Sequence, residues 1–322
     1  MMENNNVMVS IYCKAYNHEK YIRDCLEGFV SQKTDFQYEV IIHDDASTDG
    51  TADIIREYEQ KYPDIIRPIY QTENQYSKRV KVFSKFMLPM MRGKYIACCE
   101  GDDYWTDSGK LQMQVDFLEA HPDFTACVHN TEIINMSNGK RFVNYPTEDH
   151  VYGMKDMMAG SMCCYHTSSL MYRIEYAKDR PEFLRLQTGV GDYPLSLYLA
   201  MNGSIQYFGK VMSVYRYGTE GSWTRRAGNE TEQVVGRLNR RINMLEAANE
   251  YSEHRYDALF DEKIGRTRCE ILMAEGNYKA LKEEPYRQYY DKFSKKDKVK
   301  VFLMRYCPFV YRILRKFQRF YV

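Results

Sequence analysis

The first 130 residues alternate between short apolar segments typical of strands and longer segments with helical periodicity. Strand patterns lie at 7–13, 38–43, 65–70, 94–99 and 124–129, and helical patterns lie between them at about 19–31, 51–61, 78–91 and 108–120. Such alternation joins parallel strands through right-handed helical crossovers. We therefore expect an α/β fold with a mostly parallel sheet flanked by helices.

The fourth strand pattern ends abruptly in an acidic turn. Glu100, Asp102 and Asp103 follow the apolar run at 94–99. Carboxylate oxygens are the ligands that hard cations such as Mg2+ and Mn2+ prefer. The alternative is a turn that caps the next helix, because Asp and Gly are ordinary loop residues.

Two other strand patterns also end in polar residues. The second strand ends in Asp44 and Asp45, and the first ends in the polar turn 14–18. Ligands of open α/β sheets bind in the crevice outside the carboxyl ends of the strands. We therefore expect these three strand ends to form one site, which favours a metal site over a simple cap.

Length and composition indicate a folded protein of the cytosol. The 322 residues are 44% hydrophobic, enough for one large domain or a domain with an appendage. No apolar run approaches the roughly 20 residues of a membrane-spanning helix, and residues 1–6 lack the features of a secretory signal. The nine cysteines lack C-x-x-C spacing, so we expect them to be reduced and mostly buried.

The net charge of +1 conceals a basic C-terminal tail. Residues 292–322 contain ten Lys or Arg against one acid, so the tail carries +9 and the remaining chain −8. Apolar residues recur at helical spacing within it, as in interfacial amphipathic helices. We predict that the tail binds an anionic membrane surface. Packing against the body, or against a second copy of the chain in a homodimer, is the alternative, and the acidic body argues against a nucleic-acid partner.

The pattern changes after residue 130. It becomes less regular from about 130 to 225, where we expect a strand at 163–172 and a helix at 194–201. Beyond 230 the chain looks helical, with Leu238, Ile242 and Leu245 on one face. We therefore divide the chain into a domain at 1–228 and a helical C-terminal region at 229–322.

Four segments follow one another along the chain: VSIYCKAYN at 9–17, VIIHDDASTDGT at 40–51, KYIACCEGDDYW at 94–105 and KLQMQVDFLEAHPDF at 110–124. In this order and spacing they resemble the family 2 glycosyltransferases of bacterial polysaccharide synthesis, which are inverting enzymes with the GT-A fold. The resemblance covers roughly residues 7–225. It implies a Rossmann-like GT-A sheet and a nucleotide-sugar donor.

The resemblance implies that the strand ends hold the nucleotide. Ala15 and Tyr16 would border a uracil, and Asp44 or Asp45 would accept a hydrogen bond from its imide N–H. The complete set is Ala15, Tyr16, Asn17, Asp44, Asp45, Glu100, Gly101 and Asp102. The alternatives are a packed aromatic role for Tyr16 and a turn cap from Asp45 to Ser47.

The metal motif of that family is usually Asp-x-Asp, whereas this chain has Glu100 at the first position. The longer Glu100 side chain could reach a ribose or a water instead of the metal. We therefore assign Asp102 as the ligand of a Mn2+ or Mg2+ ion. Asp103 is the alternative, either as a direct ligand or as a residue that contacts the ion through another ligand. Donor diphosphate oxygens would complete the metal shell.

Inversion requires a base that takes the proton of the acceptor hydroxyl. The segment around Asp192 resembles the later acidic motif of the family, so Asp192 is the candidate base. The alternative is that Asp192 caps the following helix. The segment at 215–224 resembles a part that closes over the substrates, and the implied acceptor or lid residues are His166, Ser222, Trp223, Thr224 and Arg225. A core role is the alternative for His166.

These features predict a metal-dependent inverting enzyme that transfers a hexosyl or N-acetylhexosaminyl group. The donor would be a UDP-sugar and the acceptor a hydroxyl of a glycan or lipid-linked molecule, at the cytosolic face of a bacterial membrane. A nucleotide-sugar-forming nucleotidyltransferase is one alternative, but the turn 14–18 lacks the Gly-rich basic loop that holds a triphosphate. A catalytically silent nucleotide-sugar-binding protein is the other.

Overall fold

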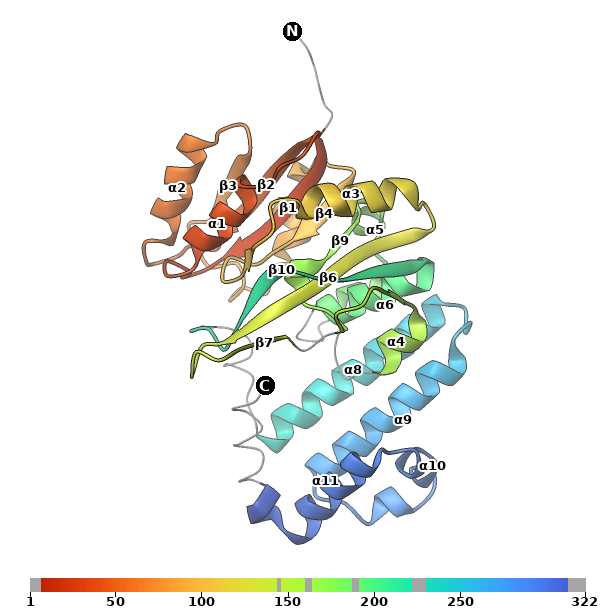
Figure 1. The fold of residues 1–322 in the computed structure, drawn as a ribbon. Helices are drawn as coiled ribbons and strands as arrows, with labels where there is room; N and C mark the ends of the chain where they lie inside the picture. Colours follow the sequence, from red (N-terminus) through yellow and green to blue (C-terminus); the bar gives the residue numbers. More distant parts are fainter. Residues whose placement is uncertain (1–6, 144–145, 160–163, 187–190, 222–229, 312–322) are drawn as a thin grey trace. The chain divides into compact units, whose positions relative to one another are not determined.

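The computed structural model describes residues 7–143, 146–159, 164–186, 191–221 and 230–311 (Figure 1). The chain divides into two compact units. The first comprises Met1–Met157, Met162–Arg180 and Leu199–Ser222, and the second comprises Met158–Ser161, Pro181–Tyr198 and Trp223–Val322. The predicted domain boundary at 228 falls within 222–229, outside the described residues, and stays a prediction.

The first unit is built on one ten-stranded sheet with the order β3-β2-β1-β4-β9-β6-β10-β5, in which β7 pairs with β6 and β8 with β10. The strands are β1 Val7–Ala15, β2 Gln37–Asp44, β3 Ile66–Tyr70, β4 Tyr95–Cys98, β5 Tyr104–Trp105, β6 Phe124–Asn135, β7 Arg141–Val143, β8 His150–Tyr152, β9 Met171–Arg173 and β10 Ser204–Tyr217. Strands β3, β2, β1 and β4 are parallel, as predicted for this half of the chain. Beyond β4 the pairing is mixed, because β9 runs antiparallel to β4 and β6 while β10 is parallel to β6.

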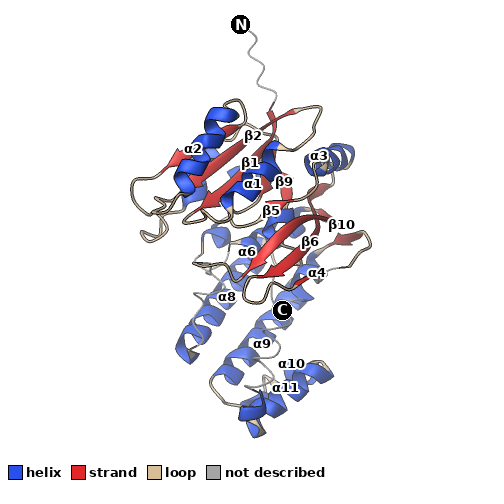
Figure 2. Ribbon diagram, turned by 60° about the vertical axis from the view of Figure 1, so that its left-hand side comes forward, coloured by secondary structure: helices blue, strands red, loops and turns tan. Residues whose placement is uncertain are grey.

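Helices cover the sheet of the first unit (Figure 2). They are α1 Ile22–Val30, α2 Thr51–Lys61, α3 Lys110–Ala120, α4 Met154–Ala159, whose end belongs to the second unit, and α5 Glu175–Lys178. The apolar residues of α1 recur at helical spacing and are fully buried: Ile22, Cys25, Leu26 and Phe29. Helix α2 begins at the predicted residue, Thr51, whose amide donates a hydrogen bond to the Asp49 side chain at 3.0 Å.

Two predicted elements are wrong. The segment 78–91 forms only a short π turn at Phe83–Met87 and a 3-10 turn at Leu88–Met90, because Pro89 cannot donate to a helical ladder. Of the strand expected at 163–172, Cys163 lies outside the described residues, and of the rest only Met171 and Tyr172 lie in a strand, β9. A 3-10 turn occupies Thr167–Ser169, where the Ser169 hydroxyl donates to the His166 carbonyl at 2.7 Å and competes with strand pairing.

The second unit is helical in its described part, which confirms the predicted helical C-terminal extension. It contains a 3-10 turn at Glu182–Arg185, the start of α6 Asp192–Asn202, α8 Thr231–Tyr251, α9 Asp257–Ala274, a 3-10 turn at Ala280–Lys282, α10 Arg287–Asp291 and α11 Lys295–Tyr306. Leu238, Ile242 and Leu245 of α8 are buried, as their spacing predicts. None of the helices in the described ranges combines the length and the apolarity needed to cross a membrane.

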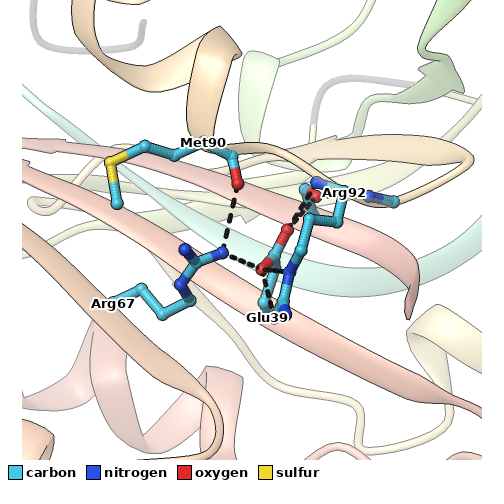
Figure 3. A network of polar contacts seen from close by, with 6 residues as sticks. Glu39, Arg67, Met90 and Arg92 are labelled. Carbon is cyan, nitrogen blue, oxygen red and sulfur yellow. Dashed lines mark hydrogen bonds and ion pairs between the residues drawn. The ribbon is translucent and has the colours of Figure 1, made fainter. Parts of the chain in front are cut away.

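The carboxylate of Glu39 links neighbouring strands by hydrogen bonds at the end of the sheet opposite the acidic turn (Figure 3). Glu39 of β2 is fully buried. It accepts hydrogen bonds from the Ser10 hydroxyl at 2.7 Å, from Arg67 Nη1 at 2.5 Å and from the Arg92 amide at 2.7 Å. Arg67 also donates to the Met90 carbonyl at 3.1 Å. This network joins β1, β2 and β3 to the chain that leads into β4.

The cysteines agree with the expectation of reduced thiols. Eight of them lie among the described residues, all are free, and six are buried. Burial raises the pKa of the Cys99 thiol to about 11, so this side chain behaves as a small apolar group at neutral pH.

Candidate active site

The three polar strand ends meet at one edge of the sheet, as the sequence predicts. Ala15 at the end of β1 lies in register with Asp44 at the end of β2. The acidic turn that follows β4 lies on the other side of β1, where the Gly101 amide donates to the Lys14 carbonyl at 2.9 Å. One edge of the first unit therefore presents the β1 turn between two groups of carboxylates.

The turn after β1 is fastened to the turn after β2. Asn17 has a positive φ of 55°, which Asn tolerates better than most residues, and its side chain accepts from the Thr48 amide at 2.8 Å. The His18 amide donates to the Thr51 hydroxyl at 2.7 Å. Ala15 is buried, whereas the Tyr16 side chain is exposed. Asn17 thus shapes the turn, and Tyr16 presents its ring at the surface of the site.

Asp44, the last residue of β2, and Asp45, the residue after it, are both buried, and each accepts hydrogen bonds from a neighbouring loop. Asp44 accepts from the Ser47 hydroxyl at 2.5 Å. Asp45 accepts from the Gln75 amide at 2.7 Å and from the Tyr76 amide at 3.0 Å. The alternative of a cap from Asp45 to Ser47 is therefore wrong, because Asp44 makes that contact. A carboxylate oxygen has two lone pairs, so both acids retain acceptor capacity.

Glu100 forms an ion pair across the β1 end. Its carboxylate lies 2.8 Å from Lys14 Nζ, and both side chains are partly exposed. The Lys14 ammonium lowers the pKa of Glu100 against the opposing effect of burial. Burial acts to lower the pKa of Lys14, but Glu100 holds that pKa well above its usual value. The pair therefore stays charged at neutral pH and keeps a cation at the acidic turn.

Gly101 is required by close packing in this turn. A Cβ atom at this position would lie 2.8 Å from His18 Nδ1 and 3.1 Å from the Lys14 carbonyl oxygen. The first distance is shorter than real Cβ contacts and the second is tighter than most, so a larger residue would displace the His18 side chain and press on the β1 turn. Gly101 therefore allows the acidic turn to approach the end of β1.

Residues at and just beyond the end of β10 donate hydrogen bonds to the two aspartates of the acidic turn. Asp102 is partly buried, and its Oδ2 accepts from the Thr219 hydroxyl at 2.7 Å. Asp103 is buried, and its Oδ1 accepts from the Arg216 amide at 2.9 Å. Burial, reinforced by the neighbouring Asp102, raises the pKa of Asp103 well above its usual value. Asp102 is thus the more accessible of the two carboxylates.

Arg216 is a site residue that the sequence does not single out. Its Nη1 donates to the Asp102 carbonyl at 2.9 Å, and its other terminal nitrogen pairs with Asp24 of α1. The guanidinium lies 4.4 Å from the centroid of the Tyr104 ring. The sequence of β10 does not mark Arg216 out, because the strand also contains the polar residues Gln206 and Lys210.

Of the other predicted site residues, His166 belongs to the first unit and Asp192 to the second. His166, in the first unit, stacks on Tyr215 with ring centroids 4.3 Å apart, and burial lowers its pKa to about 4. Asp192 begins α6 in the second unit, where its Oδ1 accepts from the Tyr193 amide at 2.8 Å. Residues 222–225, with Ser222, Trp223, Thr224 and Arg225, lie outside the described residues.

The acidic turn fits a metal that is shared with a ligand. Among the residues that the structure describes, no cluster of three His, Cys, Asp or Glu side chains is arranged to hold an ion. A Mg2+ site needs only one or two carboxylates when phosphates and water supply the other oxygens. Asp102 suits this role, because Oδ2 is held by Thr219 while Oδ1 accepts no hydrogen bond from the described residues.

The match to a family model decides the relationship of the chain. Residues 10–180, more than half of the chain, match the model of glycosyl transferase family 2. The chain belongs to this family. All three strand ends of the site lie within the matched residues, whereas Arg216 and Thr219 lie beyond them.

Similar proteins match different lengths of the chain. The uncharacterized protein Rv1520 of Mycobacterium tuberculosis is 37% identical over 224 residues, which cover 67% of this chain and 60% of that protein. The chain thus matches less than two thirds of that relative. The Escherichia coli protein WfaP, named UDP-Glc:alpha-D-GlcNAc-diphosphoundecaprenol beta-1,3-glucosyltransferase, is 35% identical over 117 residues, or 36% of this chain and 43% of WfaP.

Solved structures show the same fold at low sequence identity. S. aureus TarS 1–349 in complex with UDP superposes with a TM-score of 0.57 and 17% identity, covering 94% of this chain and 81% of that one. The mannosyltransferase PcManGT of Pyrobaculum calidifontis, in complex with GDP-Man and Mn2+, gives a TM-score of 0.50 and 18% identity, covering 89% and 84%. These likenesses confirm the GT-A-type α/β fold of this family 2 member.

Proposed function

We propose that the protein is a metal-dependent inverting glycosyltransferase that uses a UDP-sugar. The observation that carries this proposal is the meeting of the acidic turn with the ends of β1 and β2 at one edge of the sheet. A nucleoside diphosphate needs a polar base pocket at one end and a cation at the other. Asp44 and Asp45 would form the base pocket, and the turn at 100–103 would bind the cation.

Uridine is the nucleoside that the site suits best. Carboxylate oxygens accept from the imide N–H of uracil and disfavour a base with an acceptor at that position. Tyr16 offers an exposed ring beside these acids for stacking. WfaP is named for a UDP-sugar, and TarS was solved with UDP, which supports the same choice.

Asp102 would hold the Mn2+ or Mg2+ ion together with the donor diphosphate. The bound ion would neutralise the charge of the leaving diphosphate. Lys14, kept protonated by Glu100, adds a fixed positive charge at the same edge. Asp103 is turned to the Arg216 amide, so we assign it a structural role in the turn. PcManGT, which shares the fold, binds Mn2+ with its nucleotide sugar.

Asp192 would be the base that takes the proton of the acceptor hydroxyl. A single base without a carboxylate nucleophile gives one displacement and inverts the anomeric centre. The acceptor would be a lipid-linked glycan, because the name of WfaP describes a sugar on diphosphoundecaprenol. Lid and acceptor roles for His166 and for residues 222–225 belong to this proposal and rest on the resemblance to the family.

The basic tail would bring the protein to the membrane that carries such an acceptor. In α11 the side chains of Phe302 and Tyr306 are each more than half exposed, and their rings lie 5.0 Å apart. Lys295, Lys296 and Lys298 precede them in the same helix. An exposed apolar pair among cations is the composition that binds anionic lipid surfaces.

Replacing Phe302 and Tyr306 together by Glu tests the membrane proposal. We expect at least a tenfold loss of partitioning onto vesicles with anionic lipid, because two exposed aromatic rings that would insert among the lipids are lost and two negative charges are added. Sedimentation with vesicles measures it, and vesicles of neutral lipid are the control. Unchanged sedimentation with anionic vesicles would exclude α11 as the membrane-binding segment.

Asp102→Ala tests the donor and metal assignment. In the wild-type chain we expect Mn2+ to strengthen UDP binding about tenfold or more, because the ion bridges Asp102 and the diphosphate. In the variant this strengthening should disappear, while the weaker metal-free binding remains. Calorimetric titration with and without Mn2+ measures both values. A variant that keeps the full strengthening would show that another residue holds the ion.

A further inference from the structure

Thr219 occupies an unusual place for a loop hydroxyl. It lies two residues beyond the end of β10 and is 1% exposed. Its Oγ1 donates to Asp102 Oδ2 at 2.7 Å, across 117 positions of sequence. A buried hydroxyl that donates to a partly exposed carboxylate restricts the rotation of that carboxylate.

Thr219 does not make this contact in isolation. Three residues earlier, the Arg216 amide donates to Asp103 Oδ1, and Arg216 Nη1 donates to the Asp102 carbonyl. The Arg216 side chain is itself buried. The end of β10 therefore holds both the backbone of the turn and the Asp102 side chain, which leaves Asp102 little freedom to change its rotamer.

The consequence concerns the oxygen that Thr219 does not contact. Oδ2 has one lone pair engaged by the hydroxyl, whereas Oδ1 accepts no hydrogen bond from the described residues and is the more available oxygen for a ligand. Partners of this kind, which hold a metal-binding carboxylate by its second oxygen, typically change metal affinity about 10- to 100-fold when they are removed. We infer that Thr219 is a positioning residue that presents Asp102 Oδ1 to the divalent cation of the donor complex.

This inference rests on the proposed function, because it assumes that Asp102 binds the cation. A purely structural role makes a different prediction. If the Thr219 hydroxyl only satisfied a buried polar group, its removal would lower stability and leave the effect of Mn2+ on UDP binding unchanged. The two roles are therefore separated by the ratio of UDP affinities with and without Mn2+.

The chain offers a matched pair of variants for this measurement. Thr219→Val keeps the shape of the side chain and removes the hydroxyl, whereas Thr219→Ser keeps the hydroxyl and removes the methyl group. UDP is titrated calorimetrically into the full-length wild type and both variants, with Mn2+ and with EDTA, and thermal unfolding is followed in parallel.

We expect Thr219→Val to lose at least tenfold of UDP affinity in Mn2+ and less than twofold in EDTA. Thr219→Ser should retain most of the Mn2+ effect, even if both variants unfold at a lower temperature. A Thr219→Val chain with the full Mn2+ effect would overturn the inference and leave the proposed function intact. A wild type without any Mn2+ effect would overturn the metal assignment and this inference together.

Discussion

Asp192→Asn is expected to lower kcat by about 100- to 10,000-fold, because the side-chain amide cannot take the proton of the acceptor hydroxyl. UDP affinity should stay within about twofold, since Asp192 is not among the donor-binding residues that we propose. The structure explains why the fold should survive. The Asp192 carboxylate accepts from the Tyr193 amide at the start of α6, and Asn provides the same acceptor there.

A second acid at a helix start in the same unit is the matched control. Asp257 begins α9, and Asp257→Asn should leave kcat unchanged. Turnover is measured as UDP release from a UDP-sugar in the presence of a lipid-diphosphate-linked sugar. Near-wild-type turnover of Asp192→Asn would remove Asp192 from the mechanism. If the wild type bound UDP but showed no turnover with any donor, a silent binding protein would be the better description.

Glu39→Gln should lower the free energy of unfolding by about 2 kcal/mol, because a fully buried carboxylate loses charge-assisted hydrogen bonds from two partly exposed arginines. In the native protein the carboxylate accepts from Arg67, from Arg92 and from the Ser10 hydroxyl (Figure 3). Gln keeps one acceptor oxygen, but its amide nitrogen would face the donors that now bond to the other carboxylate oxygen. Chemical denaturation followed by circular dichroism measures the change in stability of the full chain.

The matched control is an exposed pair in the same unit. Glu57 of α2 accepts two hydrogen bonds from Arg23 of α1, with both side chains about half exposed. Solvent screens such a pair, so Glu57→Gln should change stability far less than Glu39→Gln does. Equal losses in the two variants would contradict the structural role that we assign to Glu39.

The contribution of Glu39 also predicts a pH dependence. Burial acts to raise the pKa of this carboxyl, but the hydrogen bonds from the Arg92 amide, Ser10 and Arg67 outweigh it and lower the pKa. A lowered native pKa means that the stabilisation is complete above the unfolded-state pKa of about 4.3 and is lost as the pH falls below it. The difference between wild type and Glu39→Gln should therefore be constant at neutral pH and shrink in acid.

Local patterns predicted the parts of the fold that depend on near neighbours in sequence. Helix α2 has the predicted bounds because Asp49 and the spacing of Ile55 and Tyr58 are local signals. The meeting of the strand ends was also predictable, because parallel strands bring their carboxyl ends to one edge. The acidic turn at 100–103 therefore lies where its sequence suggests.

The contacts that position Asp102 were not predictable, because they join residues more than 110 positions apart. Thr219 and Arg216 carry no local mark of their role, and the sequence suggested only a segment that closes over substrates. Glu39 illustrates the same limit. An acid inside an apolar strand reads as solvent-facing, yet two arginines from distant segments allow it to be fully buried.

We propose that the carboxyl-terminal edge of the sheet binds uridine diphosphate through a divalent cation. Calorimetric titration of the wild-type chain with UDP and with GDP, each with and without Mn2+, tests this proposal. We expect UDP to bind at least tenfold more tightly with Mn2+ than without it, and more tightly than GDP. Equal UDP affinities with and without Mn2+, or a preference for GDP, would contradict it.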